Sequence, residues 1–177
     1  MTQQFVYGRP VIDFVTTAVQ VCLVLEHIEK ISREEFADKM LNLLPQLYVQ
    51  IRQIDVSSQE SSDGFLERFV TEDEYNTIAD NIKRLLGSDD AYLEVFVEDM
   101  QYSDKPITQF ISENLADIYQ ELKDMAFNYQ TEDLDTMCEA IINIAVSFRE
   151  HWGQKLLNCL RPIHALSQDW SLHYEGE

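Results

Sequence analysis

Glycine and proline are scarce in this chain of 177 residues, which holds only 5 glycines and 4 prolines. Tight turns between short strands depend on these residues, so an all-β fold is excluded. Cysteine is scarce as well, and none of Cys22, Cys138 and Cys159 belongs to a CxxC motif. Each lies in an apolar helical pattern, which predicts buried thiols in a reducing compartment. Because no secretory signal pattern is present, we expect a cytoplasmic protein.

Basic residues are also few, with 13 Lys and Arg against 32 Asp and Glu and a net charge of −19. Such a surface repels phosphate backbones and anionic lipid headgroups, so we expect neither nucleic acid nor a membrane as a partner. It suits cations, basic surfaces of partner proteins, or solubility alone. The most apolar stretch, 11–28, is interrupted by Asp13, Gln20 and Glu26. It therefore predicts a core helix and not a membrane span.

The motifs that mark common catalytic sites are missing from the sequence. It contains neither a GxxxxGK[ST] nor a GxGxxG loop to hold phosphates, and no GxSxG nucleophile elbow. HExxH, calcium-loop and Glu-x-x-His patterns are missing too, although the chain has 4 histidines. We therefore expect no cofactor and no transition metal.

What the sequence does contain is a helical rhythm of apolar residues. Apolar residues that recur at intervals of three and four predict helices at 9–30, 33–54, 72–86, 107–130 and 132–166. Ser32 and Thr71 are expected to cap the second and third helices, each with Glu three residues later, and Thr131 to cap the fifth. The first stretch is apolar over most of its circumference, so we predict that it is the central helix. Gly153 and Pro162 interrupt the last stretch, which should break once.

The connecting segments complete the fold prediction. Residues 57–64 (SSQESSDG) predict a flexible linker and residues 167–177 a tail. A strand within 88–106 would have nothing to pair with, so we expect a helical turn and then an ordered acidic loop across one end of the bundle. Together the elements predict one domain over 1–177, an all-α, antiparallel up-and-down bundle of five to six helices.

Four acids recur at helical spacing on the fourth predicted helix: Glu113, Asp117, Glu121 and Asp124. Carboxylates spaced in this way can share a divalent cation, as in helical nucleoside-triphosphate pyrophosphohydrolases of the MazG kind, which bind magnesium. Glu121 and Asp124 form an ExxD, but the companion EExxE helix of that family is missing. The acids lie about 200–280° around the helix from the apolar seam, so most of them should point to solvent, and a solvated face is the favoured interpretation.

A second group of candidates surrounds Trp152. Much of the scarce positive charge gathers in this stretch, at Arg149, His151, Lys155, Arg161 and His164. Trp152 with Arg161 and His164 could hold an anion or a planar group. In the plainer interpretation Trp152 is a core residue and Gly153 admits a neighbouring helix.

The segment 102–104 (Tyr-Ser-Asp), ahead of Pro106, is a third candidate. An ordered loop that carries Tyr102 and Asp104 can bind a ligand. It can equally be a helix cap with a packed tyrosine.

The chain also resembles a known family, in the runs FVTEDEYNTIADNIKRLLG, DDAYLEVFVEDMQYSDKP, ISENLADIYQELKD and HWGQKLLNCLRPIH. These runs are similar to a bacterial family of helical domains, domain of unknown function 5063, common in the Bacteroides group. The most specific parts are 99–104 and 115–119, and Tyr119 in the second is a further binding candidate. The resemblance implies a small all-helical cytosolic protein, and it implies no activity and no catalytic residue.

Three functions remain open at this point. The first is a non-enzymatic interaction or adaptor protein that docks a partner protein, or a second copy of itself, on an acidic face or an exposed apolar helix face. The second is a magnesium-dependent hydrolase that uses the four acids. The third is a small-ligand binder with Trp152, Arg161 and His164 near Tyr102.

Overall fold

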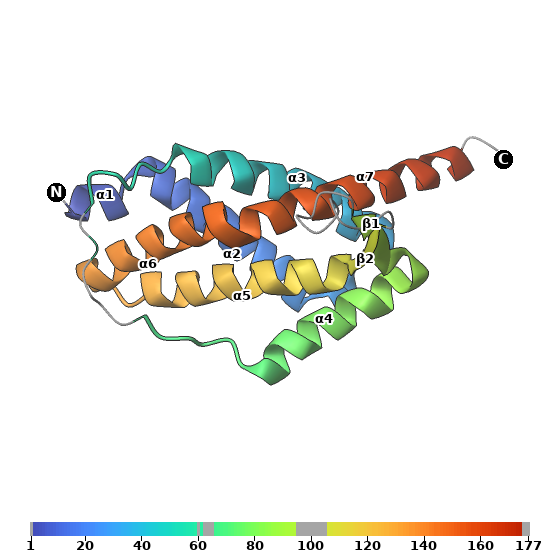
Figure 1. Ribbon diagram of the computed structural model, residues 1–177, viewed down its shortest axis with the longest axis horizontal. Coiled ribbons are helices and arrows are strands. Elements are labelled where there is room, and N and C mark those ends of the chain that lie inside the picture. Colours follow the sequence, from blue (N-terminus) through green and yellow to red (C-terminus); the bar gives the residue numbers. More distant parts are fainter. Residues whose placement is uncertain (1, 60, 62–65, 95–105, 175–177) are drawn as a thin grey trace.

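The computed structural model describes residues 2–59, 61, 66–94 and 106–174. Its helices are α1 (Thr2–Val6), α2 (Arg9–Glu26), α3 (Arg33–Gln53), α4 (Glu72–Leu86), α5 (Ile111–Tyr129), α6 (Leu134–Ser147) and α7 (Gly153–Tyr174). Short 3₁₀ turns occupy Ile28–Lys30 and Gly87–Asp90, and a π-helical turn at Phe148–Trp152 joins α6 to α7. Helices α2, α3, α4 and α5 alternate in direction, and α6 runs opposite to α5 and continues in the same direction into α7 (Figure 1), which confirms the predicted all-α bundle.

The central helix of the bundle is α5. It contacts α2, α4, α6 and α7, and its predicted seam lies in the main core, with Ile111, Leu115, Ile118, Leu122 and Met125 all buried. The prediction that the first stretch is central is wrong, because α2 packs on α3 and α5 with one side only. Its other side leaves Ile12, Val19 and Leu23 exposed. None of the described helices is long and apolar enough to cross a membrane.

Side-chain caps start the second and third predicted helices where the sequence places them. The Ser32 hydroxyl accepts a hydrogen bond from the Glu35 N–H at the start of α3 (3.2 Å). Thr71 and Glu74 form the predicted capping box of α4. The hydrogen bonds that the Glu74 carboxylate accepts from the backbone and side chain of Thr71 hold its pKa below the usual range.

The start of the fifth predicted helix differs from the prediction. Asp133 caps α6, because its carboxylate accepts a hydrogen bond from the Thr136 N–H (2.9 Å). The Thr131 hydroxyl instead donates to the carbonyl of Asn128, at the end of α5 (2.8 Å). Thr131 therefore belongs to the C-terminal end of α5, and the N-cap of α6 is Asp133, two residues after the predicted position.

A small antiparallel hairpin replaces the helical turn predicted near residue 91. Strand β1 (Ala91–Glu94) pairs with β2 (Ile107–Phe110), with Ala91 opposite Phe110. The prediction that a strand here has no partner is wrong, because the partner is the segment assigned to the first turn of the next helix. α5 consequently begins at Ile111. Tyr102, Asp104 and the rest of 95–105 lie outside the described residues.

The two ends of the chain also differ from the prediction. Helix α1 was not predicted, and it packs on α6 through a small cluster of Val6, Met137 and Cys138. Helix α7 continues to Tyr174, so 167–174 of the predicted tail is helical. Of the predicted linker, residues 60 and 62–64 lie outside the described part of the chain.

The predicted break in the last helix is the π-helical turn at Phe148–Trp152, directly before Gly153. The wider turn brings Phe148 against the backbone of Gly153. A Cβ atom at Gly153 would lie 2.5 Å from the Phe148 carbonyl oxygen and 2.8 Å from its ring carbon Cε2. Only glycine fits this contact without a shift of the backbone, which explains a glycine inside an otherwise continuous helical segment.

We predict that Gly153→Ala lowers the free energy of unfolding by about 1–3 kcal/mol, because the added methyl group overpacks the Phe148 contact. At an unstrained helical position the same change stabilises by about 0.5–1 kcal/mol. Urea unfolding measures the difference, with Gln154→Ala, at the next and exposed position, as the control. A Gly153→Ala variant at least as stable as the parent would contradict the close contact.

Candidate functional site

The four acids of α5 do not form the solvated face that the sequence suggests. Glu113 is exposed, whereas Asp117, Glu121 and Asp124 are half-buried. Asp117 lies between two neighbouring helices, where its carboxylate accepts a hydrogen bond from the Tyr75 hydroxyl of α4 (2.8 Å) and pairs with Lys155 of α7.

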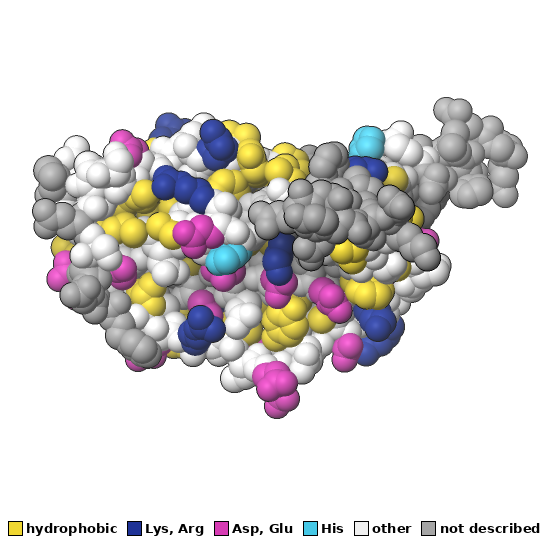
Figure 2. Space-filling view, in the orientation of Figure 1, with side chains coloured by type: hydrophobic (Ala, Val, Ile, Leu, Met, Phe, Trp, Pro, Cys, Tyr) yellow, Lys and Arg dark blue, Asp and Glu magenta, His cyan; other side chains and the backbone are white. Residues whose placement is uncertain are grey.

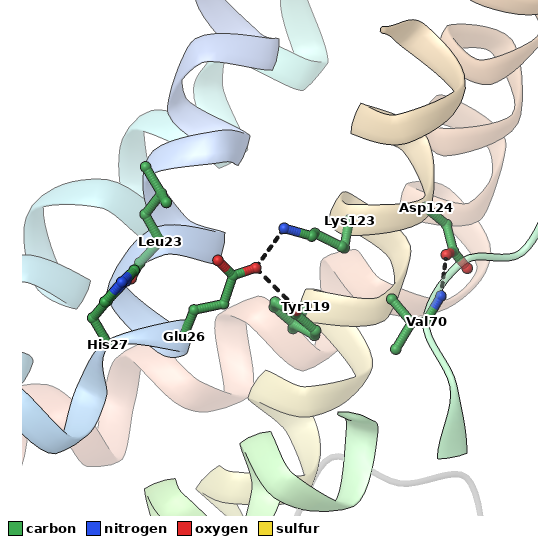
Figure 3. Close-up of polar contacts among 7 residues, drawn as sticks. All are labelled: Leu23, Glu26, His27, Val70, Tyr119, Lys123 and Asp124. Carbon is green, nitrogen blue, oxygen red and sulfur yellow. Dashed lines mark hydrogen bonds and ion pairs between the residues drawn. The ribbon is translucent and has the colours of Figure 1, made fainter. Parts of the chain in front are cut away.

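The remaining two acids bind other elements. Glu121 accepts a hydrogen bond from the Ser147 hydroxyl at the end of α6 (2.8 Å). Asp124 accepts from the backbone N–H groups of Phe69 (2.8 Å) and Val70 (2.9 Å), and so anchors the extended segment that leads into α4. Figure 3 shows Asp124 directed toward Val70.

The structure therefore does not bring the predicted magnesium ligands together. Their carboxylates point to different neighbours, and protein donors bind three of the four. Over the described residues, no three His, Cys, Asp or Glu side chains are grouped so that they could hold a metal ion. On the face in Figure 2 the acidic side chains also lie scattered, several of them beside Lys or Arg, and do not form one patch.

The second group of candidates separates in the same way. Trp152 is 1% exposed, stacks on Phe14 and contacts Phe148 edge to face, while its indole N–H donates to the Ile144 carbonyl (3.1 Å). It is a core residue. Arg161 lies more than two turns further along α7 and lines a cleft beside β1. His164 is exposed and is not among the described residues of that cleft.

Tyr119, the remaining candidate, belongs to a polar cluster between α2 and α5. Glu26 of α2 accepts hydrogen bonds from the Tyr119 hydroxyl (3.0 Å) and from the Lys123 ammonium (2.5 Å). Figure 3 shows Glu26 directed from α2 toward both α5 side chains. The ammonium also lies 5.0 Å from the centre of the Phe127 ring, close enough for a cation–π contact.

This cluster lines one wall of an open groove of about 450 Å³. The groove, called here the α2–α4–α5 groove, takes Glu26 from α2, the row Asp73, Thr77 and Asn81 from α4, and Tyr119, Lys123 and Phe127 from α5. Phe69 from the segment before α4 packs on Phe127 with ring centres 4.8 Å apart. Acids therefore outnumber bases around a partly aromatic floor.

Two titratable groups in or beside the groove, Tyr119 and Cys22, keep their protons at physiological pH. Burial, and then the hydrogen bond to Glu26, raise the pKa of Tyr119, so its hydroxyl stays neutral at physiological pH. Burial likewise raises the pKa of the neighbouring Cys22 thiol to about 12. A thiol that stays protonated is a weak nucleophile.

Two residues of the groove, Glu26 and Lys123, were missed as candidates. Both carry a signal in the sequence. Glu26 is an acid inside the most apolar stretch of the chain, and Lys123 is a base inside the most acidic part. An acid in an apolar stretch, or a base in an acidic one, usually has a charged or hydrogen-bonded partner, because burying a charge without one is costly.

The family comparison agrees with the resemblance seen in the sequence. The model of the family described as domain of unknown function DUF5063 matches residues 6–169. The chain belongs to this family. No curated protein matches the chain.

A solved structure shows the same architecture. The crystal structure of protein BF1032 from Bacteroides fragilis is similar with a TM-score of 0.82 and 34% sequence identity, over 92% of this chain and 95% of that one. The two proteins therefore share the bundle over almost their entire lengths.

We predict that Asp124→Ala exposes the backbone N–H groups of Phe69 and Val70 to solvent exchange. Loss of their acceptor should favour local opening by about 1–3 kcal/mol and speed hydrogen exchange at both amides about tenfold to hundredfold. Asp124→Asn keeps a carbonyl acceptor and should be milder. NMR exchange rates test this, with the exposed Glu113→Ala as control; unchanged rates at both amides in Asp124→Ala would contradict the anchoring role.

Proposed function

We propose that the protein is a non-enzymatic docking protein that binds a helical segment of a partner protein, with apolar and basic side chains, in the α2–α4–α5 groove. The observation that carries the proposal is an exposed apolar row on α2. Ile12, Val19 and Leu23 are 44%, 38% and 47% exposed. Single exposed apolar residues are ordinary, but these three share one helix face.

The row continues into the groove. Leu23 precedes Glu26 by three residues and Val19 precedes it by seven, spacings that place side chains along one side of a helix. Glu26 lines the groove. Phe127, 38% exposed, lies in the groove on the adjoining helix α5. The surface therefore offers a strip of apolar contacts of the length that an amphipathic helix uses as it binds in a groove.

The negative charge around the groove favours a partner segment with basic side chains. Asp73, Glu74 and Glu26 line the groove, and Lys123 there is already paired with Glu26. The whole chain carries −19. An acidic partner would be repelled and a basic one attracted over long range. The same repulsion disfavours a second copy of this chain, which would bring another −19.

The test uses a synthetic helical peptide with leucine on one face and lysine on the other, and a second peptide with glutamate in place of lysine. We expect the lysine peptide to bind and to weaken as salt rises, because salt screens the attraction. The double change Val19→Gln and Leu23→Gln should weaken binding about tenfold, since it removes apolar contact area. Calorimetric titration measures all of these affinities.

The matched control is Val49→Gln, which removes an exposed apolar side chain of α3, a helix that contributes nothing to the groove's described lining. Equal binding of the two peptides, or equal losses in the control and the α2 double variant, would refute a specific groove. Sedimentation velocity on the protein alone tests whether a second copy of the chain occupies the groove. A dimer that the α2 double variant dissociates would show that the partner is a second copy and overturn the basic-segment proposal.

A further inference from the structure

A second opening lies at the hairpin end of the bundle, where β1 sits beside α7 (Figure 1). This β1–α7 cleft has a volume of about 620 Å³. Pockets for small ligands usually measure about 300–1,000 Å³. Its described lining shares no residue with that of the α2–α4–α5 groove. Whatever binds here is therefore separate from the proposed docking function.

Apolar side chains form much of the wall of the cleft. Leu93 from β1 is 59% exposed, more than any other large hydrophobic residue described, and Leu157 from α7 is 43% exposed. Both line the cleft, with Pro162 one turn beyond Leu157. Leucines that are exposed along the lining of one cleft lose contact with water when an apolar group binds there, which is a favourable change.

One cation faces this apolar wall. Arg161 follows Leu157 by four residues, so the two side chains lie on the same face of α7. Arg161 is exposed and lines the cleft, and no carboxylate of the described residues forms an ion pair with it. Glu94 also lines the cleft, but its side chain is buried and has an interaction of its own. Within the described part of the chain, Arg161 is therefore available to an anion.

Neutral donors complete the site. The Tyr92 hydroxyl accepts a hydrogen bond from the Asn114 amide (2.6 Å), and Asn158 lies beside it on α7. Burial raises the pKa of Tyr92, so the hydroxyl keeps its proton to donate. One guanidinium with neutral donors suits a singly charged anion, because a planar guanidinium matches the two oxygens of a carboxylate. Multiply charged phosphates would meet the strong negative charge of the protein with a single cation.

We propose that the β1–α7 cleft binds a small amphipathic monocarboxylate, with its apolar body between Leu93 and Leu157 and its carboxylate on Arg161. The site combines a cavity of suitable size, apolar lining residues and one cation among that lining. Trp152 takes no part, because it lies in the core.

The experiment compares octanoate with 1-octanol, which has the same apolar chain and no charge. Calorimetry or NMR titration should show octanoate binding, and Arg161→Gln should weaken it about tenfold to hundredfold, the usual effect of losing a charge-assisted hydrogen bond. Binding of 1-octanol should change less than threefold in the same variant, as it makes no ion pair. The exposed Arg52→Gln on α3 is the matched control and should leave octanoate binding unchanged.

A second variant tests the cavity itself. Leu157→Trp places a larger side chain at a half-exposed position, so it should fill the cleft without disturbing the core, and it should abolish binding of both ligands. The α2 double variant, Val19→Gln with Leu23→Gln, should bind octanoate as the parent does. The proposal is overturned if octanoate does not bind, if Arg161→Gln leaves its affinity unchanged, or if the α2 variant and not Leu157→Trp removes binding. The last result would place the ligand in the docking groove.

Discussion

The rest of the structure depends on the burial of α5, a helix whose polar side chains, apart from the exposed Glu113, are all buried or half-buried. A buried polar group that finds no hydrogen-bond partner destabilises the folded state by ~1–3 kcal/mol. Four helices surround α5, so its polar side chains find their partners on different neighbours. Tyr119 and Lys123 bind α2, Asp117 binds α4 and α7, and Glu121 binds the end of α6. Its N-terminus, with no side-chain cap of its own, is held by the buried Asp90, which accepts hydrogen bonds from both the N–H and the hydroxyl of Ser112 (2.7 Å each).

This arrangement also explains where the two openings lie. With α5 in the centre, α2 lies at the surface and keeps one apolar side exposed, beside the groove that Glu26 and Lys123 border. The hairpin, which reaches α5 through the Tyr92–Asn114 hydrogen bond, lies against α7 and borders the second cleft. One opening has acids around aromatic rings and the other has an arginine against leucines.

The sequence predicted the elements that depend on local chemistry. The apolar seam from Ile111 to Met125, the N-caps Ser32 and Thr71 and a single break in the last stretch all follow from features of one segment. The sequence offered both Gly153 and Pro162 for that break, and the structure has it before Gly153, with Pro162 inside α7. The prediction failed where a contact joins distant segments. The strand at 91–94 pairs with residues 107–110, and no sequence feature within either segment indicates that pairing. The acids of α5 look solvated from their angle to the seam, but their partners Tyr75, Ser147, Lys155 and the backbone near Val70 come from four other parts of the chain. Family resemblance gave the fold, and it carried no information about either opening.

The central position of α5 can be tested by native-state hydrogen exchange across the whole chain. If α5 is the helix on which the others depend, its amides from Leu115 to Met125 should exchange only by global unfolding and with the highest protection in the protein. Amides of α2, which has one side in solvent, should open earlier by local fluctuations. Greater protection in α2 than in α5, or exchange of α5 while the rest of the bundle stays closed, would contradict this account.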